Sequence, residues 1–174
     1  MNTRRSPRLL IAMLSSLLAF FTASAATLPI GAAAPKVSAT TDTGETLDLG
    51  EVYSKHDYTL VWFYPMALTG GCTKQGCSLR DAAADLTKHD VAVVGVSTDA
   101  VEKQKEFKAH NNFPFPLLAD TDSKVRNAFG QEGSGRAKRE AYLIDKNGKI
   151  VYHDEGATDK QADNVLAFLA KQKS

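Results

Sequence analysis

The sequence predicts an α/β fold in which helices flank a central mixed β-sheet. Strand-like and helix-like segments alternate through the middle of the 174 residues. Two apolar runs, Tyr58–Tyr64 and Val91–Ser97, are typical of strands buried on both faces. The turn Asn147-Gly148 indicates a late antiparallel hairpin, so the sheet should contain both parallel and antiparallel pairs.

An N-terminal β-hairpin extension is expected before the first buried strand. Residues Val37–Thr40 and Glu45–Leu47 flank the turn Asp42-Thr43-Gly44, where glycine suits a tight reversal. Leu49–His56 should form a short helix that leads into the strand.

Helices and strands then alternate. We expect a helix over about Gly71–Lys88, and Asp99 is a suitable cap for a helix over Ala100–His110. A short strand at Phe115–Ala119 and a helix at Ser123–Phe129 follow.

The C-terminal part closes the domain with a hairpin and a helix. A polar loop, Gln131–Lys138, precedes strands at Glu140–Asp145 and Lys149–Tyr152. Asp159 should begin the last helix, which places apolar residues on one side: Val165, Leu166, Phe168 and Leu169.

Residues 1–25 have the pattern of a signal peptide. Three arginines precede the apolar run Leu9–Phe21, and Ala23-Ser24-Ala25 is a small-residue cleavage site. The mature chain, residues 26–174, would be one exported domain, in the bacterial periplasm. The alternative is a leader retained as a membrane anchor, although its strongly apolar run is shorter than the roughly 20 residues that cross a bilayer.

The charge balance argues against a nucleic-acid partner. The chain is 43% hydrophobic and 24% charged, and cleavage of the leader would remove three arginines and change the net charge from +1 to −2. Most of the densest basic run, Arg136-Ala137-Lys138-Arg139, is interpreted as a solvated loop.

The two cysteines, Cys72 and Cys77, follow a proline and two glycines at the end of the first buried strand. That places a thiol at the start of a helix, where the partial positive charge and free N–H groups favour a reactive thiolate. A structural disulfide would close too short a loop to add more than about 2 kcal/mol. Cysteines at i and i+5 of a helix have Cα atoms roughly 8.5 Å apart, whereas a disulfide needs less than about 7 Å.

Two further interpretations of the cysteine pair are a metal site and a catalytic dithiol. A metal site would need help from histidine, and the four histidines lie alone in the sequence without ligand-like spacing. No metal and no cofactor are therefore expected. A bond that forms only when a helix unwinds suits a dithiol that cycles between two redox states.

The segment around Cys72 and Cys77 resembles a peroxiredoxin of the PrxQ, or bacterioferritin-comigratory, subfamily. Pro65, Thr69 and Cys72 match the P-x-x-x-T-x-x-C pattern, and Cys77 has the subfamily's spacing. Five further blocks resemble the subfamily in its order: Phe63-Tyr64-Pro65, Leu79-Arg80-Asp81, Gly95 to Asp99, Phe115 to Asp120 and Leu143 to Ile150.

The resemblance implies a thioredoxin-like fold and a peroxidase. Cys72 would be the peroxidatic cysteine, Cys77 the resolving one, and Thr69 would hold the peroxide. Arg139 matches the family's active-site arginine, and Pro65 would shape the loop and shield the thiolate. The partners would be a hydroperoxide substrate and a thioredoxin-like dithiol reductant, and the chain would be a monomer or weak homodimer. From residue type alone, Thr69 could instead cap a helix and Arg139 could be a surface charge.

The sequence departs from the subfamily in three places. Gly70 replaces the usual proline, and glycine loosens the turn. Met66-Ala67-Leu68 replaces charged residues, which predicts an apolar contact surface for a second subunit, a reductant or a hydrophobic peroxide. Gln75 stands where the subfamily often has glutamate.

Two other functions remain open from the sequence. A thioredoxin-like oxidoreductase that acts on protein disulfides normally has C-x-x-C, which is absent here. A copper-binding module of thioredoxin-like fold would need a histidine near both cysteines.

Overall fold

The computed structural model describes residues 27–133 and 135–172, so the predicted signal peptide lies outside the described residues. Seven strands form one mixed sheet in the order β2-β1-β5-β4-β3-β6-β7. At its centre β3 pairs parallel with β4 and antiparallel with β6. The strands are β1 Ser38–Thr41, β2 Thr46–Asp48, β3 Tyr58–Phe63, β4 Val91–Ser97, β5 Leu117–Ala119, β6 Glu140–Asp145 and β7 Ile150–Glu155.

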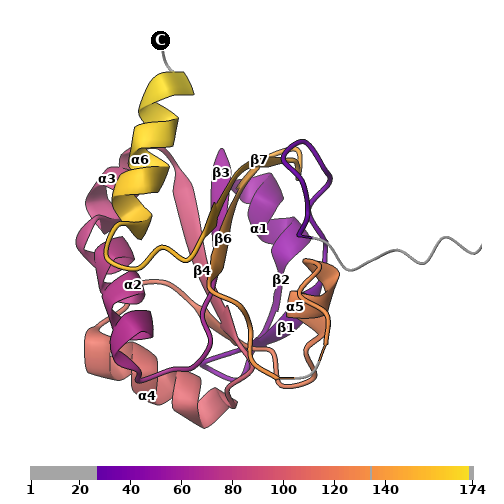
Figure 1. Ribbon diagram of the computed structural model, residues 1–174, viewed down its shortest axis with the longest axis vertical. Coiled ribbons are helices and arrows are strands. Elements are labelled where there is room, and N and C mark those ends of the chain that lie inside the picture. Colours follow the sequence, from indigo (N-terminus) through magenta and orange to yellow (C-terminus); the bar gives the residue numbers. More distant parts are fainter. Residues whose placement is uncertain (1–26, 134, 173–174) are drawn as a thin grey trace, which may run out of the picture.

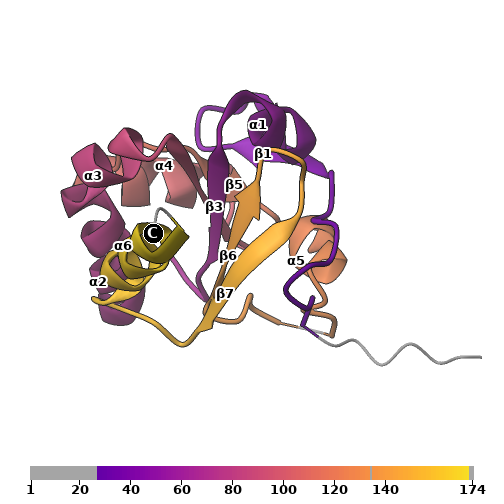
Figure 2. The ribbon, with the colours of Figure 1, turned by 90° about the horizontal axis from the view of Figure 1, so that it is seen from above.

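Helices cover both faces of the sheet, as predicted (Figures 1 and 2). One face carries α2, α3, α4 and α6, and the other carries α1 and α5. The helices are α1 Leu49–Lys55, α2 Gly70–Asp81, α3 Ala83–Lys88, α4 Val101–Asn111, α5 Lys124–Ala128 and α6 Gln161–Gln172. Among the described residues, no helix combines the length and the apolar character that a bilayer crossing requires.

The central strand β3 explains how one apolar run supports two cores. Side chains of a strand alternate between faces, so Leu60 and Trp62 join the core under α2, α3, α4 and α6. Val61 and Phe63 enter the core under α1 and α5. All four are fully buried, which is why the sequence shows no polar alternation here.

The predicted helix over Gly71–Lys88 is wrong in one respect. It divides into α2 and α3 at Ala82, whose φ of −93° and ψ of 8° leave the helical region. Residues 82–84 are alanines, which are strong helix formers, so no local signal marks the break. Arg80, just before it, donates from Nη1 to the carbonyl of Asn111 at 2.7 Å, so tertiary contacts act on this end of α2.

The strand predicted at Phe115–Ala119 is shorter than expected and begins at Leu117. Pro116 has no N–H to donate to a sheet, which explains the later start. Phe115 is still buried, and with Phe113 it packs edge-on against Trp62.

Candidate active site

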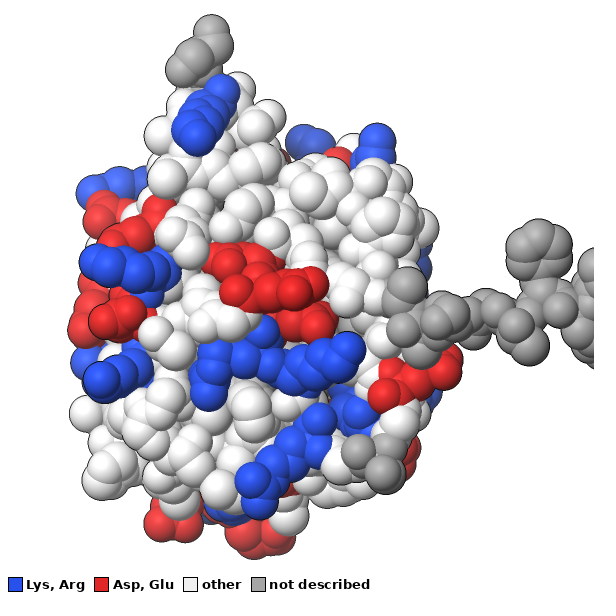
Figure 3. All heavy atoms as spheres, in the orientation of Figure 1, with Lys and Arg blue, Asp and Glu red and all other residues white. Residues whose placement is uncertain are grey.

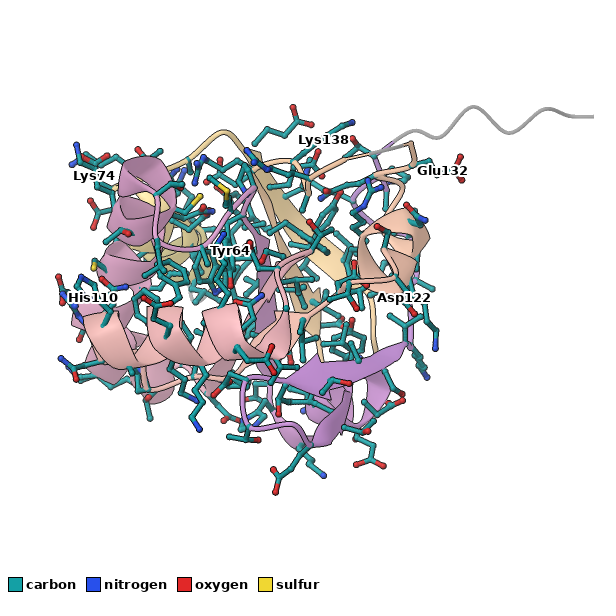
Figure 4. The ribbon with its side chains drawn as sticks, turned by 90° about the horizontal axis from the view of Figure 1, so that it is seen from below. Tyr64, Lys74, His110, Asp122, Glu132 and Lys138 are labelled. Carbon is teal, nitrogen blue, oxygen red and sulfur yellow. The ribbon has the colours of Figure 1, made fainter. Side chains whose placement is uncertain are left out.

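The chain leaves the sheet just before the cysteine segment. The N–H of Tyr64 donates to the carbonyl of Val96 at 3.1 Å, which extends the pairing of β3 with β4 by one residue. Pro65 follows and has no N–H, so the pairing cannot continue and the chain turns into a loop. Figure 4 shows Tyr64 in the interior and Lys74 at the outside of α2. The buried Tyr64 hydroxyl donates to Gln104, and burial raises the pKa of Tyr64.

Asp99 anchors this loop and does not cap α4 as predicted. The N–H of Ala67 donates to Asp99 Oδ2 at 2.7 Å, and Lys103 Nζ lies 2.8 Å from Oδ1. Helix α4 begins after Ala100, which makes no side-chain cap bond. Burial raises the pKa of Asp99, but hydrogen bonds from Lys103, Ala67 and Ser97 outweigh burial and hold that pKa below its usual value. The carboxylate therefore holds, by a hydrogen bond, a loop that lies about 32 residues earlier in the chain.

The last two loop residues set the entry into α2. Leu68 has a φ of 64°, in the left-handed region that non-glycine residues seldom adopt. Thr69 is the N-cap residue of α2, yet its side chain makes no cap bond. Its hydroxyl instead donates to the carbonyl of Met66 at 2.8 Å. The oxygen can still accept a hydrogen bond, so the side chain is available to a ligand that donates one.

Cys72 lies in the first turn of α2 and is only 1% exposed. Arg139, directly before β6, donates from Nη2 to Cys72 Sγ at 3.4 Å. The structure thus brings together two residues that are 67 positions apart in the chain. The guanidinium and the helix N-terminus both favour a negative charge on this sulfur.

Gln75, whose role the sequence left open, is fully buried beside this pair. Its Oε1 accepts from Arg139 Nη1 at 2.7 Å, so the two arms of the guanidinium contact Gln75 and Cys72. Its Nε2 donates to Oε1 of Gln161 at 3.0 Å. No pattern in the sequence marks Gln161 as a site residue, because only the packing of α6 against α2 brings it here.

Cys77 lies on the same helix, half-buried, with its sulfur 3.8 Å from Asn111 Oδ1. Both cysteines are free thiols in this structure. Because α2 runs without a break from Gly70 to Asp81, the i, i+5 spacing holds their Cα atoms roughly 8.5 Å apart. A disulfide between them requires α2 to unwind locally.

The predicted apolar surface at Met66-Ala67-Leu68 is wrong in part. Ala67 is 1% exposed and Met66 is half-buried, so only Leu68, at 38%, is an exposed large apolar side chain in this stretch. The partly buried hydrogen bond from the N–H of Ala67 to Asp99 draws the middle of the loop inward.

One group of three possible metal ligands exists within residues 27–133 and 135–172. It comprises Glu140, His153 and Glu155, on neighbouring strands β6 and β7. Neither cysteine belongs to it, so nothing in the described residues combines the dithiol with a histidine as a copper site would require.

The similarity of this sequence to known proteins agrees with the geometry of the site. The pattern of the AhpC/TSA family matches residues 30–153. The chain belongs to the AhpC/TSA family of peroxiredoxins. This peroxiredoxin is 37% identical to peroxiredoxin Bcp of Bacillus subtilis over 84% of its own length and 96% of the relative. It is 38% identical to peroxiredoxin Bcp of Escherichia coli over 82% of its own length and 96% of the relative.

A solved structure supports the same conclusion. Peroxidoxin BcpB of Mycobacterium tuberculosis superposes with a TM-score of 0.80 at 31% identity, covering 84% of this chain and 99% of that one. The expected thioredoxin-like peroxiredoxin fold and the membership of the Bcp/PrxQ group are thereby confirmed. This peroxiredoxin is a thiol peroxidase and hence an oxidoreductase.

Proposed function

We propose that this peroxiredoxin reduces hydrogen peroxide and organic hydroperoxides with Cys72 as the peroxidatic and Cys77 as the resolving cysteine. The observation that carries the proposal is the contact of Arg139 Nη2 with Cys72 Sγ, 3.4 Å apart, at the N-terminus of α2. Cys77 has a different position, five residues further along the helix and next to Asn111.

The reaction divides into three steps. The Cys72 thiolate attacks one peroxide oxygen, the O–O bond breaks, and the second oxygen leaves with a proton as water or an alcohol. Cys72 is then a sulfenic acid, and the Cys77 thiol condenses with it to a disulfide and releases water. A thioredoxin-like dithiol protein returns both cysteines to thiols by exchange and is itself oxidised to a disulfide.

The arginine must do more than ionise the thiol. An ordinary thiol is already a few per cent ionised at pH 7, so full ionisation raises the rate only about 30-fold. The remainder has to come from donors that stabilise charge on the leaving oxygen. Arg139 supplies such donors beside Cys72 Sγ, and the Thr69 hydroxyl oxygen can accept a hydrogen bond from the O–H of the peroxide.

A peroxide-consumption assay with a thioredoxin-like dithiol protein tests this function. Cys72→Ser should lose all activity, because no thiolate remains to attack. Cys77→Ser should react once and accumulate a trappable sulfenic acid, because nothing condenses with it. Full turnover by Cys72→Ser would refute the assignment.

The same assay separates the alternatives. A thiol–disulfide oxidoreductase would reduce protein disulfides without consuming peroxide. A copper-binding module would bind Cu(I) and would not consume peroxide either. The wild-type protein should consume both hydrogen peroxide and cumene hydroperoxide in amounts equal to the dithiol oxidised.

The location and remaining partners are also proposals. The signal-peptide pattern of residues 1–25 supports export to a bacterial periplasm, with membrane attachment only if the leader is retained. Acidic and basic side chains both gather on the face in Figure 3. We propose no nucleic-acid partner, because a near-neutral chain has no overall positive field to attract a phosphate backbone. The proposed oligomeric state is a monomer or weak homodimer. Fractionation of cells followed by N-terminal sequencing tests the location and the cleavage site.

A further inference from the structure

Two buried glutamines connect Arg139 to the C-terminal helix. Gln75 and Gln161 are both fully buried. Arg139 Nη1 donates to Gln75 Oε1, Gln75 Nε2 donates to Gln161 Oε1, and Gln161 Nε2 donates to Asp154 Oδ2, at 2.7, 3.0 and 3.2 Å. A cation therefore stands at one end of this relay and a carboxylate at the other.

The two ends determine which way each amide points. Arginine has donors only, so Gln75 must present its oxygen to Arg139. At the far end, Asp154 Oδ2 receives two further donors, Asn164 Nδ2 at 2.8 Å and the Tyr152 hydroxyl at 3.1 Å. A carboxylate oxygen accepts hydrogen bonds and donates none, so Gln161 must present its amide nitrogen to it.

We propose that Gln161 and Asp154 are positioning residues for the peroxidase reaction. By fixing the amide of Gln161, Asp154 makes Gln161 Oε1 the acceptor for Gln75. Gln75 then keeps its own oxygen on Arg139 Nη1, and the other arm of the rigid guanidinium stays on Cys72 Sγ. This inference rests on the proposed function of Arg139. Gln161 lies beyond residues 30–153, the part of the chain that matches the family pattern.

Without Gln161 the orientation of Gln75 is no longer determined. Its amide nitrogen would be buried without a partner, which is costly, or it would turn toward the guanidinium, where two donors oppose each other. The cost of the unpaired nitrogen favours the second outcome, which displaces Arg139 from the position where its Nη2 contacts the sulfur.

The relay also explains why glutamine stands at position 75, where the PrxQ subfamily often has glutamate. A glutamate there would accept from Arg139 but could offer no donor to Gln161. Gln161 would have to turn, and its oxygen would then face the carboxylate of Asp154. Glutamine at position 75 and the Gln161–Asp154 pair are therefore a matched set.

The test measures the reaction of the reduced enzyme with hydrogen peroxide by rapid mixing. Gln161→Met keeps the size of the side chain and removes the relay, so we expect a rate roughly tenfold lower. Gln161→Glu should also be slow, because its carboxylate faces Asp154. Adding Asp154→Asn should restore most of the rate, because the introduced amide donates to the new carboxylate and the total charge returns to that of the wild type. The partly exposed Asn164 and Tyr152 can turn their oxygens toward the introduced amide nitrogen. Failure of this rescue would overturn the inference.

Two comparisons exclude a merely structural effect. Ser78 Oγ lies 3.5 Å from the carbonyl of Thr158 and donates to the backbone carbonyl of Gln75 at 3.0 Å, so Ser78→Ala removes a contact between α2 and the residues before α6 without removing any side-chain bond of the relay. It should leave the rate within twofold of the wild type, and a loss as large as that of Gln161→Met would overturn the inference. In an Arg139→Gln background, Gln161→Met should slow the reaction no further. An additive loss of rate in the double variant would overturn the inference.

The outcomes also separate this inference from the proposed function. If Arg139→Gln retains the wild-type rate, the proposed role of Arg139 is wrong and the relay has nothing to position. If Arg139→Gln is slow and Gln161→Met retains the wild-type rate, the inference alone is wrong.

Discussion

At the residue scale, the site depends on how Arg139 divides its donors. One arm of the guanidinium contacts Cys72 Sγ and the other contacts Gln75, and the planar fork links the two positions. A lysine would offer one flexible ammonium and could not hold both partners in this way. Small changes in the space around Nη2 should therefore alter the peroxide reaction.

Gly71 provides a test of that space. A Cβ added at Gly71 would lie 3.1 Å from Arg139 Nη2, so the guanidinium would have to shift by a few tenths of an ångström. We expect Gly71→Ala to slow the reaction with peroxide severalfold. The measurement is the second-order rate constant of the reduced enzyme.

Gly70 is the matched control for this change. A Cβ added there meets nothing within 4 Å, so Gly70→Ala should keep the wild-type rate. Both substitutions replace glycine by alanine in the first turn of α2 and should leave the free energy of unfolding equal or up to about 1 kcal/mol higher. Equal rates for the two variants would contradict the argument from Arg139.

At the element scale, α2 carries both cysteines and must change shape during the cycle. Its continuous helix holds the two Cα atoms too far apart for a disulfide. Hydrogen bonds to other elements, among them Gln75 to Gln161 and Arg80 to Asn111, oppose unwinding. The reduced state is thus an ordered helix, and the disulfide state requires some of these bonds to open.

Amide hydrogen exchange should show this difference. In the oxidised protein, amides within residues 70–80 should exchange at least about tenfold faster than in the reduced protein, because their helical hydrogen bonds are lost. Amides of α4 provide the internal comparison and should change little. Equal protection of residues 70–80 in both states would mean that the oxidised form is not a disulfide within α2.

At the scale of the whole molecule, Asp99 joins three parts of the fold. It follows β4, accepts from the N–H of Ala67 in the active-site loop, and pairs with Lys103 of α4. Its side chain is 12% exposed, so these contacts are largely shielded from water. The loop before Cys72 is therefore fixed by a carboxylate from elsewhere in the fold.

Acid should release this anchor. The pKa of Asp99 is lower in the folded protein than its ordinary value of about 3.9, so its contribution to stability is present above that pH. It is lost as the pH falls below about 3.9 and through the folded-state pKa. We expect Asp99→Asn to be about 1–2 kcal/mol less stable at pH 7.

The check is chemical denaturation of the wild type and Asp99→Asn between pH 2.5 and 7. The difference in the free energy of unfolding should shrink as the pH falls below about 4. A difference that stays constant over this range would show that the charge of Asp99 contributes nothing to the anchor.

The sequence by itself determined the main strands and helices and the family to which the thiol segment belongs. Buried runs such as Tyr58–Tyr64 predict central strands because both faces of the sheet are covered. The offsets of Pro65, Thr69 and Cys72 select the peroxiredoxin pattern, and Arg139 does lie against Cys72. Local rules of periodicity and turns suffice for the strands and helices, because they act within a few residues, whereas the expectation for Arg139 came from the resemblance to the family.

Only the tertiary structure decided the contacts that join distant segments. Asp99 resembles a helix cap in the sequence but anchors a loop, and the break at Ala82 lies among helix-forming alanines. The bond of Gln75 to Gln161 spans 86 residues. A buried polar group takes whichever partner the packing brings to it, and leaving it without one is costly, so its partner depends on the whole fold and not on its neighbours in the chain.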